Sequence, residues 1–410
     1  MKLLLKLAWR NLWRNKRRSL ITLAAIAFAT FAAIAMRGMQ KGTYAANIKH
    51  VVNMFSGYLQ IQNAEYNSNP SLRKNFKVDE KLIAALNSNE KIISYSLRLY
   101  ADGLISYKDN SQGAIIFAVD PIAEKNVTTL ESRTNAGSFL SSDSTFEIVL
   151  GHKLLDKLNA EIGNEIVLLA QGFDGSLGNM KFKIVGTSKL GIQEFDGMSA
   201  FIGLKTAQEL TSMYNRIHAI AVKIDNLNDI DEVKASLSQS IDNENLAVLS
   251  WDEVMPDFKQ SIALDNISGI FMLMFLIIIV AFGILNTILM SVTERFNEFG
   301  ITLSIGMPQL KLVLLIVIET IALTAIGLII GNILGWFTNY YLHLNPIEFA
   351  SGEYGAVMED YGWLPIMPSS IEPMIFINTS LIILFASLLS CLYPAYKVFK
   401  LEPLKGIRYT

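Results

Sequence analysis

The residues most able to carry a function in this chain lie in a short charged turn between two long apolar runs. The turn reads Thr-Glu-Arg-Phe-Asn-Glu-Phe-Gly-Ile over 293–301, and Gly306 follows. Glu294 and Glu298 are four residues apart, which predicts that they share one helix face. Gly300 and Gly306 can end a short helix or let it pack tightly. A soluble motor protein could bind such a turn and move it. The alternative is that the charged residues are only solvated surface, which is common in turns.

Common catalytic constellations are missing from the sequence. There is no Gly-Lys dipeptide and hence no phosphate-binding loop, and there is no HExxH or GxSxG motif. One cysteine, Cys391, and four scattered histidines give no metal-ligand spacing. His152, at the start of a predicted helix, is interpreted as a surface or cap residue. We therefore predict no catalytic, cofactor or metal residues and no enzyme.

Four apolar runs are long enough to cross a membrane. The chain of 410 residues is 51% hydrophobic and 18% charged, against about 25% charged in ordinary soluble domains. A spanning helix needs roughly 20 apolar residues. The predicted spans are 19–42, 266–293, 311–342 and 374–396. A cleaved signal peptide is the weaker alternative for the first run, because its basic flank is long and the run exceeds a usual signal core.

Lysines and arginines are distributed unevenly between the loops, which predicts the orientation. Among the short segments, 1–18, 294–310 and 397–410 carry the basic residues and are predicted to be cytoplasmic. Segment 343–373 has no lysine or arginine, and it faces outward together with 43–262. Its acids are Glu348, Glu353, Glu359, Asp360 and Glu372. The overall charge of -2 gives no indication of nucleic-acid binding.

The first eighteen residues form a basic stripe. Lys2, Lys6, Arg10 and Arg14 recur every four residues, and two tryptophans lie among them. This pattern favours a helix in the cytoplasmic headgroup layer, with a plain topogenic flank as the alternative.

Segment 43–262 is long enough for its own core. The hydrophobic pattern predicts strands at 57–62, 114–119, 166–170, 182–185, 219–224 and 246–249. It predicts helices at 81–86, 150–158 and 230–241. Asp79 is the expected cap of the first helix, and Asn228 or Asp229 that of the last. The predicted fold class is an α-helical membrane protein with four transmembrane helices and a large mixed α/β extracytoplasmic domain inserted between helices 1 and 2. Small sheets with helices on one face are expected.

The third run carries two further features. Gly327, Gly331 and Gly335 let another helix approach closely, either within the subunit or in a dimer. Glu319 is an intramembrane acid, and such a group is costly and usually has a partner. We predict a structural or interfacial role for Glu319, because a proton relay would need more such groups.

This layout resembles the permease family that includes the lipoprotein-releasing LolC and LolE subunits, the exporter MacB and the cell-division protein FtsX. The resemblance covers the whole chain. It rests on the Ala-Trp-Arg-Asn-Leu run at 8–12, on the charged turn, and on the Tyr-Pro-Ala and Pro-Leu-Lys-Gly-Ile-Arg sequences at 393–395 and 403–408. The residues before helix 2, beginning Trp251-Asp252-Glu253, look more like LolC and LolE than like MacB or FtsX.

The resemblance implies a bacterial inner-membrane permease that works by mechanotransmission. A separate cytosolic ATPase dimer would use the ATP and move the turn, and a second copy or a homologous permease would complete the complex. The implied coupling residues are Glu294, Arg295, Glu298, Phe299, Gly300 and Gly306. Lipoproteins are the expected substrate. A regulator of a cell-wall hydrolase and an exporter of peptides or drugs are the alternatives. The hook that captures a lipoprotein chaperone in LolC-type members would correspond to 171–180, which is short and glycine-rich here.

Overall fold

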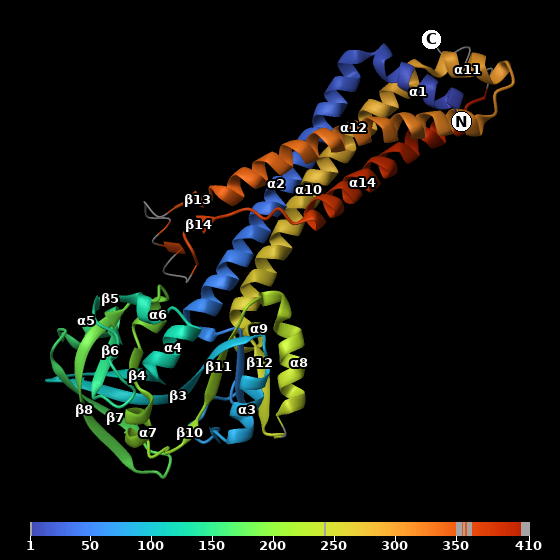
Figure 1. Ribbon diagram of the computed structural model, residues 1–410. Coiled ribbons are helices and arrows are strands. Elements are labelled where there is room, and N and C mark those ends of the chain that lie inside the picture. The colour runs from blue at the N-terminus through green and yellow to red at the C-terminus, as the bar shows by residue number, and fades with distance from the viewer. Residues whose placement is uncertain (1, 242, 350–354, 356, 359–362, 403–410) are drawn as a thin grey trace. The chain divides into compact units, whose positions relative to one another are not determined.

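The computed structural model describes the chain except residues 1, 242, 350–354, 356, 359–362 and 403–410 (Figure 1). Glu353, Glu359, Asp360 and the motif at 403–408 therefore lie outside the described residues. The chain divides into two compact units. The helical unit comprises Met1–Ala45, Ile262–Glu348 and Ile366–Thr410. The sheet domain comprises Ala46–Ser261 and Phe349–Pro365, so much of the expected loop at 343–373 belongs with this domain.

Four helices are long and apolar enough to cross a membrane: α2 (Lys16–Val51), α10 (Pro256–Glu294), α12 (Gln309–Leu344) and α14 (Pro373–Phe399). Two shorter helices accompany them: α1 (Lys2–Arg14) precedes α2, and α11 (Phe296–Ser304) lies between α10 and α12 in the sequence. The 39 residues of α10 would measure roughly 58 Å at 1.5 Å per residue, against about 30 Å for the hydrocarbon core. Both α2 and α10 thus run well past their apolar segments, and α2 continues without a break into the sheet domain.

Polar side chains join α2 to α10 where the apolar runs end. Arg37 donates a hydrogen bond of 2.6 Å to Gln40 and one of 3.0 Å to Asn266. Gln40 donates to Tyr44, whose hydroxyl binds the Asp265 carboxylate. Arg37 therefore meets polar side chains of both helices.

The sheet domain is built on one ten-stranded sheet. Its order is β12-β1-β11-β3-β4-β9-β6-β8-β5, and β7 pairs with both β3 and β8. The strands are β1 (Leu59–Asn63), β3 (Ile92–Tyr107), β4 (Asn110–Val119), β5 (Thr134–Gly137), β6 (Glu147–Gly151), β7 (Glu165–Gln171), β8 (Leu177–Ser188), β9 (Ser199–Gly203), β11 (Ala219–Ile224) and β12 (Leu246–Ser250). Two-residue pairs, β2 (Phe76–Lys77) with β10 (Arg216–Ile217) and β13 (Ile347–Glu348) with β14 (Ile366–Met367), are separate.

Part of this sheet closes on itself. The pairings run from β3 through β4, β9, β6, β8 and β7 back to β3. The strands β11, β1 and β12 extend from β3 as an open arm. The prediction of small sheets was therefore wrong, because the long strand β3 ties the ring and the arm into one sheet. Side chains such as Ile105, Ile116, Leu168 and Ile202 fill the core.

Short helices fill the connections: α3 (Glu80–Ser88), α4 (Pro121–Val127), α5 (His152–Leu158), α6 (Gln193–Asp196), α7 (Leu204–Leu210), α8 (Ile230–Ser240) and α9 (Trp251–Val254). The Asp79 carboxylate accepts a hydrogen bond of 2.7 Å from the Leu82 N–H, so the predicted cap of α3 is confirmed. Asp229 occupies the predicted cap position of α8, but its side chain makes no capping hydrogen bond. The Asn226 side chain instead accepts a hydrogen bond from the Asn228 N–H and starts a short 3-10 turn that leads into α8. The predicted helix at 150–158 begins only at His152, because β6 occupies the residues before it.

The two ends of the sheet domain meet on neighbouring strands. After α2 comes a five-residue π-helical turn, η1 (Val52–Ser56), and then β1. At the other end, β12 leads through α9 into α10. β1 and β12 are antiparallel neighbours, with Leu59 opposite Ser250. Both long helices therefore connect to the same edge of the sheet.

Candidate coupling site

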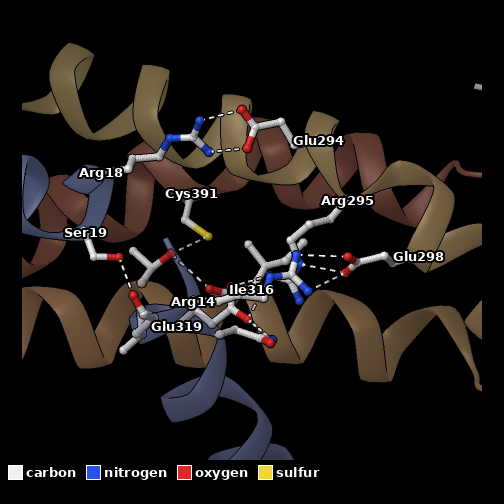
Figure 2. Close-up of polar contacts among 12 residues, drawn as sticks. Arg14, Arg18, Ser19, Glu294, Arg295, Glu298, Ile316, Glu319 and Cys391 are labelled. Carbon is white, nitrogen blue, oxygen red and sulfur yellow. Dashed lines mark hydrogen bonds and ion pairs between the residues drawn. The ribbon is translucent and has the colours of Figure 1, made fainter. Parts of the chain in front are cut away.

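Glu319 of α12 lies at the centre of a polar network in the helical unit (Figure 2). Its carboxylate accepts two hydrogen bonds of 3.0 Å from the Arg295 guanidinium and one of 2.7 Å from the Asn11 amide. The Arg295 and Glu319 side chains are only 11% and 13% exposed. The intramembrane acid thus has a cationic partner, as its cost in an apolar environment leads one to expect.

Arg295 also separates α10 from α11. α10 ends at Glu294, Arg295 leaves the helical conformation at φ -102° and ψ 7°, and α11 starts at Phe296. The prediction that Glu294 and Glu298 share one helix face was therefore wrong, because they belong to different helices. The residue at which the helix breaks is therefore also the residue that pairs with Glu319.

Both turn glutamates pair with arginines at the start of the chain (Figure 2). Arg14 binds Glu298 at 2.9 Å, and Arg18 donates two hydrogen bonds to Glu294, one of 2.7 Å. The Arg14 and Glu298 side chains are each about half exposed. Exposed ion pairs contribute little to stability, on the order of 0.2–1 kcal/mol each. Their consequence here is geometric, since they fasten the turn to the junction of α1 and α2.

Apolar side chains anchor the short helix α11. Phe296 and Phe299 are buried, and they pack in one cluster with residues of α10, α12 and α14, including Ile288, Ile316 and Val398. Gly300 is buried in the same helix. Gly306, after the end of α11, has φ +99°, a conformation that favours glycine. α11 is therefore packed against the spanning helices through its buried face.

One face of helix α1 packs against the helical unit, and the opposite face is exposed. Ala8 and Leu12 are buried, and Ala8 contacts Leu315 of α12. Trp9 and Trp13 are exposed, with ring centroids 6.1 Å apart. An amphipathic helix with exposed tryptophans suits the lipid interface.

The three glycines of α12 line its contact with α2 of the same chain. A Cβ at Gly327 would lie 2.6 Å from Ile26, and one at Gly331 would lie 2.4 Å from Thr30. A Cβ at Gly335 would lie 2.7 Å from Ile34. Of the two readings left open by the sequence, these contacts agree with packing inside one subunit.

The described residues hold no group of three or more histidine, cysteine or carboxylate side chains that could bind a metal. His152 is the first residue of α5, and its Nδ1 lies 3.6 Å from Asp196. Sequence reasoning identified Glu294, Arg295, Glu298 and Glu319 but missed Asn11, Arg14 and Arg18 as their partners. The four-residue spacing of Arg14 and Arg18 matches that of Glu294 and Glu298, and this was the available signal.

Two family models match the chain. The MacB-like periplasmic core domain matches residues 19–240, and the FtsX-like permease C-terminal domain matches residues 270–403. The lipoprotein-releasing system transmembrane protein LolC of Neisseria meningitidis is 20% identical over 82% of this chain and 83% of its own length. The ABC transporter permease MJ1507 of Methanocaldococcus jannaschii is 20% identical over 98% of this chain and 96% of its own. The ABC transporter permease YvrN of Bacillus subtilis is 22% identical over 99% of both chains. The chain belongs to the ABC transporter permeases of the LolC, MacB and FtsX type, with the four spanning helices and mixed α/β domain of that fold class.

Proposed function

We propose that this permease is driven by a separate cytosolic ATPase dimer and works by mechanotransmission, acting on lipoproteins in the bacterial inner membrane. Both termini and α11 lie in the cytoplasm in this proposal, and the sheet domain lies outside. The basic residues around α1 and α11 support this orientation. ATP hydrolysis is assigned to the partner, and the permease contributes the movement.

The observation that carries this proposal is the fastening of α11. Glu298 of α11 reaches Arg14, Glu294 reaches Arg18, and Arg295 between them reaches Glu319 of α12. A push on α11 therefore acts on α1, α2, α10 and α12 together, through contacts that are already made. α2 and α10 then lead to neighbouring strands of the sheet domain. Continuous helices that lead from the end that an ATPase would push to the domain that would handle substrate are what mechanotransmission requires.

Lipoprotein is the substrate class that the LolC relatives favour, although general ABC permeases match at similar identity. The β7–β8 hairpin argues against chaperone capture by this chain. Its tip is tied down, because the Phe173 N–H donates to the Thr211 carbonyl at 2.7 Å and Arg216 lies over the Phe173 ring. A hairpin fixed in this way is poorly suited to act as a projecting hook. We therefore do not assign chaperone capture to this chain.

A second permease, either another copy or a homologue, has a natural place beside α10. Only 11% of the most apolar 18-residue stretch of α10 is buried within the chain, against 39% for the helix that contains α2. Residues such as Phe271, Phe275, Ile279 and Phe282 are exposed along it. Lipid alone could cover this face, so cross-linking from Phe275→Cys tests the assignment. We expect disulfide-linked pairs in membranes, either between two copies of this variant or between this variant and a homologue that carries a cysteine at the matching position. Only monomers in both experiments would contradict the assignment.

The first experiment is purification of the tagged protein in mild detergent with mass spectrometry of what co-elutes. Recovery of a soluble ATPase and of lipid-modified proteins supports the proposal. An ATPase with a cell-wall hydrolase, and no lipoprotein, would favour a regulator that transports nothing. An ATPase with neither, together with release of peptides or drugs, would favour an exporter. Recovery of no ATPase from an intact membrane complex would overturn the mechanism.

The role of α11 is tested separately with Glu298→Lys, which places a positive charge beside Arg14 and Arg295. We expect substrate release per ATP to fall, while the fold is kept, because the pair is half exposed. Glu65→Lys in the sheet domain is the matched control for a charge reversal. Equal release by both variants in a reconstituted complex would remove α11 from the mechanism.

A further inference from the structure

The end of α2 inside the sheet domain has an unusual backbone. The five residues Val52–Ser56 form the π-helical turn η1, which closes with a hydrogen bond of 2.9 Å from the Gly57 N–H to the Val52 carbonyl. Gly57 has φ +73°, a conformation that favours glycine. π-helical turns are rare and are frequently found at functional sites. A turn at this position sets the direction in which the chain leaves α2 and enters the sheet.

A buried arginine holds this turn from the side. Arg98 of β3 is 0% exposed, and its guanidinium donates a hydrogen bond of 2.5 Å to the Phe55 carbonyl. The same group lies over the Phe55 ring, 5.0 Å from its centroid. The ring itself packs edge-on against Phe117 at 5.0 Å. Both the backbone and the side chain of Phe55 are thus fixed to the sheet.

A carboxylate fixes the arginine in turn. Glu124 of α4 accepts hydrogen bonds from the Arg98 Nε at 3.2 Å and from an Arg98 terminal nitrogen at 2.5 Å. Thr128 adds a further bond of 2.6 Å to Glu124. Just beyond it, the Thr129 N–H donates to the Asn53 carbonyl at 2.7 Å. Two carbonyls of η1 are therefore held, one by the Arg98–Glu124 pair and one by the chain that follows α4.

The stability of the fold does not by itself explain the buried Arg98–Glu124 ion pair. Its side chains are each 1% exposed, so both charges lose their hydration. Replacing a buried ion pair by apolar residues of similar volume is often neutral or stabilising. What apolar residues cannot do is donate a directed hydrogen bond to the Phe55 carbonyl. β3 is also the strand that pairs with β11, β4 and β7, so a load on Arg98 reaches both the ring and the arm of the sheet.

We propose that Arg98, positioned by Glu124, is the joint that makes the sheet domain follow the movement of α2. This inference rests on the proposed mechanism of force transmission, and it assigns one step of that mechanism to a residue pair. With the joint intact, the domain and the last turns of α2 move as one body. Without it, η1 becomes a hinge, and a displacement of α2 is lost in bending.

The test uses the full complex with its ATPase and the double variant Arg98→Met/Glu124→Leu, which keeps the volume and removes the directed bond. Spin labels at Lys49→Cys on α2 and Glu90→Cys in the sheet domain report the distance between them. We expect a narrow distribution that is the same with and without ATP analogue in the wild-type protein, and a broad one in the variant. Release per ATP should fall on the order of tenfold, within the usual range of coupling between distant sites, while ATP hydrolysis continues.

The matched control is Lys91→Met/Glu232→Leu, which removes an exposed pair of 2.7 Å in the same domain. It should keep the narrow distribution and full release. A narrow distribution with full release in the Arg98→Met/Glu124→Leu variant would overturn the proposal and leave the pair a structural role.

If the double variant does not fold, the same distance and release measurements on the single variant Arg98→Lys test the proposal. Lysine keeps the charge beside Glu124 but lacks the planar fork that reaches two acceptors at once. Broad distances in this variant are expected, and narrow distances with full release would overturn the joint. If the wild-type complex releases no lipoprotein, the proposed substrate fails. The comparison of distance widths then still tests the joint.

Discussion

The Arg295 guanidinium and the Glu319 carboxylate, which belong to a turn and to a spanning helix, share two hydrogen bonds of 3.0 Å with almost no exposure to solvent. Neither charge would be tolerated there alone, since an unpaired buried ion is strongly destabilising. The pair therefore makes the position of the turn depend on α12. This relationship leads to the first prediction.

Glu319→Gln should destabilise the helical unit. The amide can still bind Asn11, but it leaves the buried Arg295 charge with only the half-exposed Glu298 carboxylate, 3.5 Å away, as its partner. We expect a loss of about 3 kcal/mol in the free energy of unfolding, the lower end of the penalty for breaking a buried pair. Unfolding of the purified protein in mixed micelles, followed by circular dichroism, measures it. Glu348→Gln, at an exposed position, is the control. An equal stability of both variants would show that Arg295 does not need Glu319.

Reversing the charges of Arg18 and Glu294 should show whether Glu294 acts through its ion pair with α2 or by binding the ATPase directly. Glu294→Lys alone places two cations together and should reduce coupling of ATP hydrolysis to release. If the contact with α2 is what matters, adding Arg18→Glu restores the ion pair and should restore coupling. Reconstituted complexes with each single variant and with the double variant give the measurement. Coupling that stays lost in the double variant would indicate instead that Glu294 binds the ATPase directly.

The four spanning helices and most short elements could be predicted because their signals are local. An apolar run of 20 residues or a strand such as β11 is readable in its own stretch of sequence. The partners of Glu319 could not be predicted, because Asn11 and Arg295 are 308 and 24 residues away in the chain. The break at Arg295 was also missed, since the four-residue spacing of Glu294 and Glu298 favours one continuous helix and the residue that pairs with Arg295 in α12 lies outside that stretch of sequence. Distant pairing also hid the closed ring of strands, which depends on β3 meeting β7.

The sheet domain should lose stability between about pH 6.5 and pH 4 because of His218. Burial lowers the pKa of His218 to about 4. Its Nδ1 accepts a hydrogen bond from the Tyr100 N–H, and its Nε2 lies 3.3 Å from the Leu72 carbonyl, an arrangement that suits the neutral ring. The unfolded chain binds a proton more readily than the folded one in this range. The stabilisation is thus fully present above about pH 6.5 and falls by about 3 kcal/mol as the pH drops to 4.

Hydrogen exchange of the β3 and β11 amides in the full-length protein, corrected for the intrinsic rate at each pH, measures this effect. His218→Gln keeps a donor and an acceptor but cannot take up the proton, so it should show a shallower pH dependence. The same slope in the variant and the wild-type protein would assign the loss of stability to other groups.

Gly331→Ala should destabilise the helical unit, whereas Gly283→Ala should not. A Cβ at Gly331 would lie 2.4 Å from the Thr30 Cβ and 2.7 Å from the Ala27 carbonyl oxygen, so α2 and α12 would have to move apart. Overpacking of this kind costs about 1–3 kcal/mol. At Gly283 of α10 nothing lies within 4 Å of an added Cβ, and alanine favours the helix by about 1 kcal/mol in water. The same micelle unfolding assay applied to both variants tests the contrast. Since both substitutions add one methyl group to a glycine in a spanning helix, an equal effect would mean that the α2–α12 contact contributes nothing specific to stability.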